Sequence, residues 1–94
     1  MLDVRCQCEE DALTFTLRGE VTDETAPLLD SLLRAALTVD VPLVVVDISG
    51  LTEFAASGLP VLVSLSQRCR NAGRSLSMRG PTDGPFGLLQ LAVD

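Results

Sequence analysis

The sequence contains no histidine, lysine or tyrosine, and this absence removes many of the side chains that enzymes use for acid–base chemistry. No pair of carboxylates occurs at an obvious spacing, and Ser57 has no visible base to activate it as a nucleophile. The segment RGPTDGPFG, residues 79–87, lacks both the spacing and the lysine of a phosphate-binding loop. We therefore predict a protein without enzymatic activity and without a cofactor.

Long apolar runs are also missing. Although 47% of the residues are hydrophobic, no run approaches the roughly 18 residues that indicate a membrane-spanning helix. The N-terminal segment MLDVRCQ lacks the basic start and apolar core of a signal peptide. These absences predict a cytoplasmic protein that does not insert into a membrane.

Positive charge is scarce. The net charge is −6, and the first 54 residues carry eleven acidic side chains against three arginines. Because phosphate backbones bind clustered positive charge, nucleic acid is not an expected partner. The length of 94 residues allows one domain with one modest hydrophobic core.

The sequence has three cysteines, Cys6, Cys8 and Cys69. Cys6 and Cys8 lie two residues apart on a predicted strand, where their Cα atoms are about 6.5–7 Å apart, near or beyond the disulfide limit. An odd number of cysteines in a chain without a signal peptide favours reduced thiols. Without histidine or a C-x-x-C motif, we predict no metal site and interpret all three as small buried hydrophobic residues.

Apolar and polar residues alternate over residues 3–9 and again over residues 13–18, which predicts an antiparallel hairpin with one wet face. Apolar residues then recur at helical spacing, after three N-cap candidates and a proline that is tolerated only in a first turn. The side predicted to be buried carries Leu29, Leu32, Leu33, Ala36 and Leu37. The N-cap candidates are Thr22, Asp23 and Thr25.

Residues 43–46, LVVV, form a continuous run typical of a strand buried on both faces in a sheet covered by helices. A second helix is predicted over residues 59–72, with Gly73 ending it. A short strand follows with Leu76 and Met78 on one face, and residues 80–94 predict a turn and one more helix. The predicted class is α/β: a mixed four-stranded sheet with an N-terminal antiparallel hairpin and helices packed on it, in the order ββαβαβα.

The segment DISGLTEFAASGLPVL, residues 47–62, joins the central strand to the second helix. In open α/β sheets, ligands and partners commonly bind at the carboxyl ends of strands, and a helix N-terminus favours negative charge. Ser57 is the only hydroxyl close to the helix start. We interpret Ser57 first as the N-cap, and the alternative is a serine that accepts a phosphate there.

These motifs together resemble a STAS domain, the module of bacterial anti-sigma-factor antagonists and of sulfate transporter tails. Residues 43–81 are similar to the antagonists' central strand, Asp-Ser-Ser-Gly-Leu turn, helix, glycine stop, second strand and Gly/Ser-Pro pair. Residues 17–29, LRGEVTDETAPLL, are similar to their Leu-x-Gly-Glu-Leu-Asp-x-x-Thr-Ala segment. The resemblance covers nearly the whole chain in the right order and implies the STAS-like (SpoIIAA-like) fold.

The resemblance places the family's phosphorylated serine at Ala56. In the family, an anti-sigma kinase phosphorylates the first serine of the turn, and phosphorylation breaks the complex. Alanine has no hydroxyl, so phosphate transfer to Ala56 is chemically impossible. Ser57 is rotated by about 100° on a helix, where a kinase that recognises the usual position would miss it. Three further departures from the family pattern are Ala55, Thr22 and Pro60.

The resemblance implies a protein-interaction module that binds an anti-sigma factor, its kinase or a related regulator, and that phosphorylation at the usual serine does not switch. One alternative is a small STAS subunit that binds and regulates the ATPase of a lipid-transport ABC system. Another is an accessory STAS domain whose turn senses a small ligand. The implied partner-binding residues are Glu20, Thr22, Asp23, Thr25, Thr52, Phe54, Ala55, Ala56, Ser57, Gly58 and Leu59.

Family members usually continue into a further strand and helix beyond a segment like LLQLAVD. The resemblance therefore implies that residues 1–94 form a single STAS domain without these last elements, either because the protein is minimal or because the sequence is a piece of a longer chain. Such an ending predicts an exposed sheet edge or pairing with another chain, a second copy of this protein included.

Overall fold

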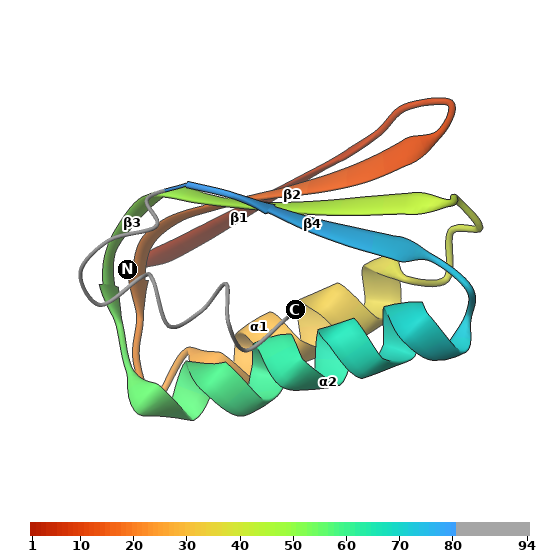
Figure 1. Ribbon diagram of the computed structural model, residues 1–94. Helices are drawn as coiled ribbons and strands as arrows, with labels where there is room; N and C mark the ends of the chain where they lie inside the picture. Colours follow the sequence, from red (N-terminus) through yellow and green to blue (C-terminus); the bar gives the residue numbers. More distant parts are fainter. Residues whose placement is uncertain (81–94) are drawn as a thin grey trace.

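The computed structural model describes residues 1–80, so the helix predicted in residues 80–94 lies outside the described residues. Four strands form one sheet: β1 (Leu2–Cys8), β2 (Ala12–Val21), β3 (Leu43–Phe54) and β4 (Ser75–Arg79). Two α-helices and a short 3-10 helix accompany them: α1 (Ala26–Ala36), η1 (Ala56–Gly58) and α2 (Leu59–Asn71). The predicted α/β class is confirmed (Figure 1).

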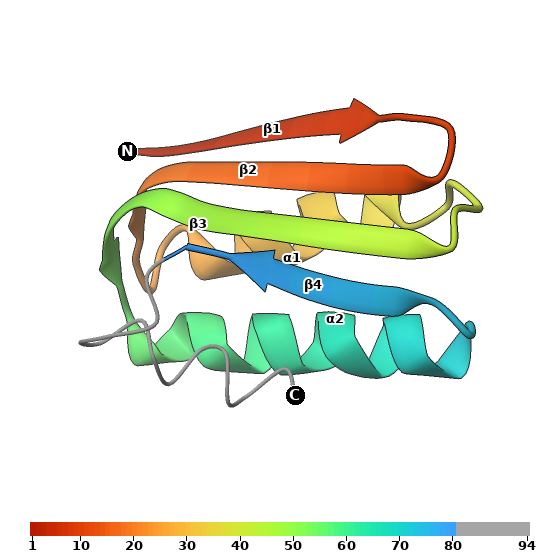
Figure 2. The same ribbon diagram turned by 45° about the horizontal axis from the view of Figure 1, so that its top comes forward.

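The strands are ordered β1-β2-β3-β4 across the sheet. β1 pairs antiparallel with β2, whereas β2 with β3 and β3 with β4 are parallel. The N-terminal hairpin is therefore confirmed, and the parallel pairs are joined through the two helices. Figures 1 and 2 show both helices against the same face of the sheet.

The hydrophobic core lies between this face and the helices. Burying each large aliphatic side chain there stabilises the fold by about 1.5–3 kcal/mol. Of the residues exposed by less than 2%, Phe15 is the largest. The other large, fully buried side chains are Leu13, Leu17, Leu29, Leu33, Ile48, Leu62, Leu65, Val21, Val44 and Val46.

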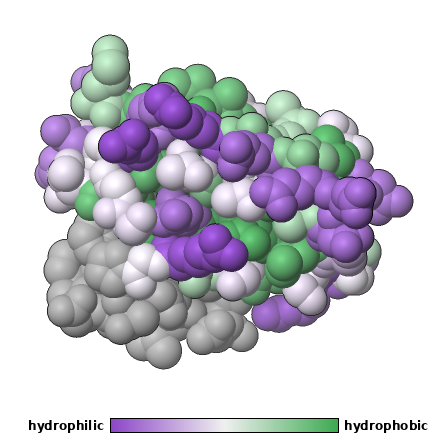
Figure 3. Space-filling model, turned by 90° about the horizontal axis from the view of Figure 1, so that it is seen from above, coloured by the Kyte–Doolittle hydropathy of each residue, from purple (hydrophilic) through white to green (hydrophobic). Residues whose placement is uncertain are grey.

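The apolar run in β3 is buried, but the helices of the described residues cover only one of its faces. Val44 and Val46 point into the core, whereas Val45 faces the other way and is still only 3% exposed. Its neighbours across the sheet are Thr14 and Ser77. The predicted burial on both faces is thus confirmed, although the described helices cover only the face of Val44 and Val46. Figure 3 shows hydrophilic side chains on the open face.

Helix α1 begins after Thr25, which is its N-cap, and tolerates Pro27 in its first turn. Leu29 and Leu33 are buried as predicted. The prediction for Leu32 is wrong, because this side chain is 41% exposed. Asp30, Leu33 and Arg34 face α2, so the helical rotation of about 100° per residue places Leu32 on the opposite flank, where the described residues include no further helix.

Helix α2 ends in a Schellman motif. Gly73 has a φ of 73°, its N–H donates to the Arg70 carbonyl, and the Arg74 N–H donates to the Cys69 carbonyl at 2.8 Å. A side chain strains this left-handed conformation, which is the reason for glycine there. The predicted helix stop is confirmed. In β4, Leu76 and Met78 both pack against the core, as predicted.

The cysteine prediction is confirmed at one position of three. Cys69 is 1% exposed in α2, and burial raises the pKa of its thiol. Cys6 and Cys8 are exposed, so their interpretation as buried residues is wrong. The reason is their place in the sheet: β1 is an edge strand, and the tip of its hairpin extends beyond the helices (Figure 1). All three thiols are free.

Candidate functional site

The candidate site forms where the parallel strands β2 and β3 end. Glu20 lies opposite Glu53, and Val21 lies opposite Phe54, in the last pairs of the ladder. Each strand then turns into the N-terminus of a helix, at the same end of the molecule (Figure 1). The β2–α1 turn (residues 22–25) and the β3–α2 turn (residues 55–58) are neighbours for this topological reason.

A pair of threonines closes the β2–α1 turn. The Thr22 N–H donates to Thr25 Oγ1 at 2.7 Å, and the Thr25 N–H donates to Thr22 Oγ1 at 3.3 Å. The two hydroxyl oxygens are 3.2 Å apart, within hydrogen-bond distance. These threonines therefore hold the turn in shape through their hydroxyl oxygens.

Two hydrogen bonds join the β3–α2 turn to its neighbour. The Ala55 N–H donates to the Val21 carbonyl at 2.8 Å. The Ser57 hydroxyl donates to Asp23 Oδ1 at 2.6 Å, which is the short distance of a bond to a charged acceptor. The structure thus brings together Asp23 and Ser57, which are 34 residues apart in the sequence.

The N-cap interpretation of Ser57 is wrong. Gly58 is the N-cap of α2, no side chain caps the helix, and Ser57 lies inside the 3-10 turn η1. The physical reason is that η1 adds a tight turn before α2, closed by the Gly58 N–H donating to the Ala55 carbonyl at 2.9 Å. This turn leaves the Ser57 hydroxyl beside Asp23.

The remaining predicted site residues divide by exposure. Ala56, Asp23 and Thr52 are exposed, and Thr52 Oγ1 donates to the Gly19 carbonyl at 3.1 Å. Phe54 and Leu59 pack against the core, and Gly58 is buried beneath the Phe54 ring. Phe54, Gly58 and Leu59 therefore support the β3–α2 turn from the core side, and Ala56 is exposed to solvent.

Negative charge dominates the site. Residues 20–25 and 52–59 include four acidic side chains, Glu20, Asp23, Glu24 and Glu53, and no arginine. Asp47, on β3, belongs to a different environment: hydrogen bonds from the Ser49 hydroxyl at 2.6 Å and from the Ser49 N–H hold the pKa of its carboxyl below the usual value. These hydrogen bonds stabilise the charged form of the Asp47 carboxylate.

Nothing in residues 1–80 indicates a metal centre or a membrane span. No group of three or more cysteine or carboxylate side chains in that range is placed to hold a metal ion. No helix there has the length and apolar character needed to cross a bilayer.

A sequence-family model described as "Mlab, STAS domain" matches residues 4–92. The chain belongs to the STAS domain family. Comparison with curated protein sequences gives no match.

Solved structures show the same fold at low sequence identity. An anti-sigma factor antagonist from Mycobacterium paratuberculosis is 22% identical with a TM-score of 0.79, over 97% of this chain and 80% of the other. The antagonist SpoIIAA in its unphosphorylated form is 11% identical with a TM-score of 0.76, over 97% of this chain and 83% of the other. Mglu is 17% identical with a TM-score of 0.71, but the match spans 82% of this chain and only 19% of that protein.

This STAS domain has a groove of about 320 Å³ between the first turns of α1 and α2, which the sequence did not predict. It begins beside the Ser57–Asp23 bond, and the Arg34–Asp30 ion pair, 2.9 Å long, lies along it. Only the packing of the two helices creates it, so the helical pattern of either segment alone carries no signal for it. Its lining residues are Asp23, Ala26, Pro27, Asp30, Arg34, Ser57, Pro60, Val61 and Ser64.

Replacing Ser57 with alanine is expected to lower the free energy of unfolding of the STAS domain by about 1 kcal/mol, because the bond to Asp23 is lost. Urea unfolding of Ser57→Ala, Asp23→Ala and the double variant measures this coupling. Purely additive losses would show that the bond does not hold the two turns together. Ala56→Gly is the neighbouring control in which this bond is retained.

Proposed function

We propose that this STAS domain is a non-enzymatic interaction module that binds an anti-sigma factor, its kinase or a related regulator. The binding surface is the pair of turns, residues 22–25 and 55–58, with Glu20 and Thr52 beside them. Family membership supports an interaction role, and the shared fold with antagonists of anti-sigma factors supports this class of partner.

The observation that carries the proposal is the linkage of the two turns around an exposed Ala56. The Ala55–Val21 and Ser57–Asp23 hydrogen bonds fix both turns as one rigid surface. A preformed surface loses little conformational entropy when a partner binds, which favours affinity. The docking geometry is in place although the side chain at position 56 offers no hydroxyl.

The charge of the surface specifies the partner further. Four carboxylates without a neighbouring arginine in the two segments favour a partner that presents basic side chains. Ser57, the nearest hydroxyl, already donates to a carboxylate, and a phosphate there would meet the negative charge of Asp23. We therefore propose that the complex is constitutive with respect to phosphorylation at position 56.

Affinity capture from the native lysate, followed by mass spectrometry, tests the proposal. The wild-type chain is expected to retain an anti-sigma factor or regulatory kinase, and Ala56→Arg is expected to lose it. The matched control is Ala72→Arg, an exposed alanine at the other end of α2. Equal retention by Ala56→Arg, or no regulator on the wild-type chain, would contradict the proposal.

The phosphorylation claim has its own test. Ala56→Ser, incubated with the captured kinase and ATP, is expected to gain a phosphate and release its partner, whereas wild type gains none at Ser57. Ala55→Ser is the control for an added hydroxyl one residue away. Phosphate on wild-type Ser57 would sink the claim of a constitutive complex.

A second candidate is the small STAS subunit that binds the ATPase of a lipid-transport ABC system. It is supported by membership of the STAS domain family, which the matching family model shows without distinguishing an antagonist from a transporter subunit. The same capture experiment decides between the two: co-purification with an ATPase instead of a sigma-regulatory kinase supports this second function.

A further inference from the structure

Strand β1 has a sheet neighbour on one side only among the described residues. The Glu9 N–H donates to the Ala12 carbonyl at 2.8 Å, and the Glu20 N–H donates to the Met1 carbonyl at 3.3 Å. Antiparallel ladders alternate, so the odd-numbered residues of β1 direct their backbone groups toward β2. The N–H and C=O groups of Leu2, Val4 and Cys6 therefore point outward, in position to pair with another strand.

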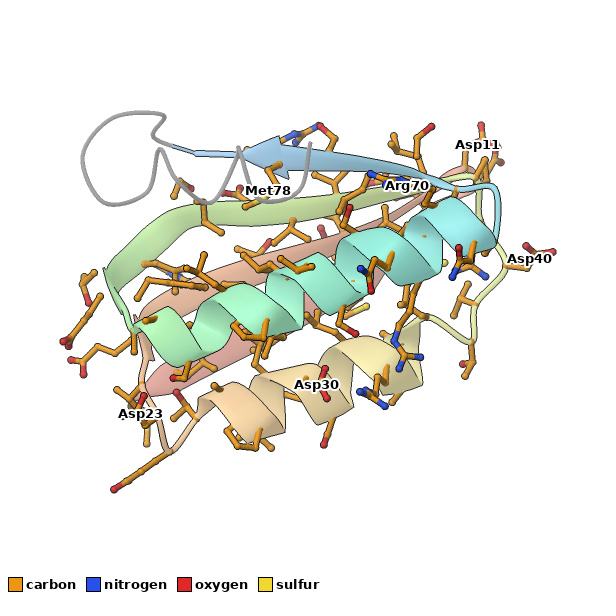
Figure 4. The ribbon with its side chains drawn as sticks, turned by 60° about the horizontal axis from the view of Figure 1, so that its bottom comes forward. Asp11, Asp23, Asp30, Asp40, Arg70 and Met78 are labelled. Carbon is orange, nitrogen blue, oxygen red and sulfur yellow. The ribbon has the colours of Figure 1, made fainter. Side chains whose placement is uncertain are left out.

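The side chains beneath this edge are apolar. Val4 lies opposite Leu17 and Cys6 opposite Phe15, so both share the face that the helices cover. Helix α1 lies on the β1 side of the molecule, with α2 between it and the region under β4 (Figure 4). A strip of apolar side chains thus follows β1 toward the outer flank of α1.

Two leucines continue this strip on α1. The side of α1 that packs on α2 carries Asp30, Leu33 and Arg34. Since each residue turns a helix by about 100°, Leu28 and Leu32 lie on the opposite flank. They are 54% and 41% exposed, the most exposed large hydrophobic side chains of the described residues apart from Met1. An unpaired edge and an apolar flank on the same side indicate a protein interface.

We propose that this edge binds a second copy of the chain, with β1 pairing antiparallel to the partner's β1 about a two-fold axis at Val4. The two sheets then become one continuous sheet. Because the axis is perpendicular to the sheet, the helices of both copies lie on the same side of it. Leu28 and Leu32 therefore face the corresponding flank of the partner's α1 beneath the joined strands, in an isologous interface.

The charged side chains of β1 favour this register over registers with the two-fold axis at Arg5 or Cys6. Asp3 and Arg5 are exposed on the open face and form an ion pair of 3.4 Å within the strand. With the two-fold axis at Val4, Asp3 lies opposite the partner's Arg5, and Arg5 lies opposite the partner's Asp3. Centring on Arg5 opposes two arginines, and centring on Cys6 opposes Asp3 and the partner's Glu9. Like charges directly opposite each other destabilise a strand pair, so these two alternatives are disfavoured.

Sedimentation equilibrium of the full chain under reducing conditions tests the pairing. Wild type is expected to dimerise, and Asp3→Arg is expected to raise the dimer dissociation constant at least about tenfold, since two favourable pairs become repulsive. Adding Arg5→Asp to that variant restores opposite charges and is expected to recover dimerisation. Glu10→Arg makes the same charge change in the hairpin turn, outside the paired residues, and is expected to dimerise like wild type.

Disulfide trapping tests the axis itself. Residues directly opposite in a hydrogen-bonded pair have Cα atoms about 5.5 Å apart, within reach of a disulfide. Val4→Cys in a Cys6→Ser, Cys8→Ser background is therefore expected to form a covalent dimer on oxidation, and circular dichroism checks that the variant is folded. A monomeric wild type, a charge-reversed double variant that stays monomeric, or a folded Val4→Cys variant without the cross-link would each overturn the proposal.

Discussion

Replacing Phe15 with alanine is expected to lower the free energy of unfolding by about 4 kcal/mol, the largest loss among the substitutions proposed for this STAS domain. Phe15 is 1% exposed and is the largest of the fully buried side chains. It lies on β2 between Cys6 of β1 and Val46 of β3, so its removal leaves a cavity where three strands meet. Rigid strands close over such a cavity only in part. The loss of stability therefore includes both the hydrophobic transfer free energy of the removed ring and the cost of the remaining cavity.

Thermal and urea unfolding measure this loss. A domain of this size has a total stability of about 5–10 kcal/mol, so the melting temperature is expected to fall by about 20 °C. Phe15→Leu leaves a smaller cavity and keeps the measurement within range if the alanine variant unfolds. Thr14→Ala, on the same strand but the open face, is the control and is expected to change stability by less than about 0.5 kcal/mol. Similar losses at both positions would contradict the assigned core.

Gly58→Val is expected to cost about 3 kcal/mol, for a steric reason and not a conformational one. The backbone of Gly58 has a φ of −79°, which any residue adopts. A Cβ added there lies 2.6 Å from Phe54 Cζ and 2.9 Å from Val21 Cγ1, closer than atoms can pack. The ring that must move also supports the β3–α2 turn, so partner capture is expected to fall together with stability.

Gly73 is the matched control for Gly58. Its φ of 73° strains any side chain, but an added Cβ there has no atom within 4 Å. Gly73→Ala is expected to cost about 1–2 kcal/mol from backbone strain alone. Adding Phe54→Leu is expected to rescue part of the loss in Gly58→Val and none of the loss in Gly73→Ala. Urea unfolding of these four variants and of Phe54→Leu alone measures the coupling, and its absence at Gly58 would show that the ring contact is not the cause.

Much of the local structure was predictable from the sequence, because it depends on short-range patterns. Alternation over residues 3–9 and 13–18 defines the hairpin, and helical spacing defines α1 and α2. Gly73 ends α2 because only glycine takes the left-handed conformation there without strain. The family could also be inferred from the motif set of residues 17–29 and 43–81, since the order of motifs along a chain does not depend on how it packs.

What the sequence alone could not determine depends on distances between segments that are far apart along the chain. Periodicity states which side of a strand or helix is apolar, but not whether another element covers it; Cys6, Cys8 and Leu32 are exposed for this reason. The residue type and position of Ser57 fit an N-cap, yet its hydroxyl donates to Asp23 because two parallel strands bring the turns together. The sequence determined that position 56 has no hydroxyl, and the tertiary structure decided that hydrogen bonds join the two turns beside it.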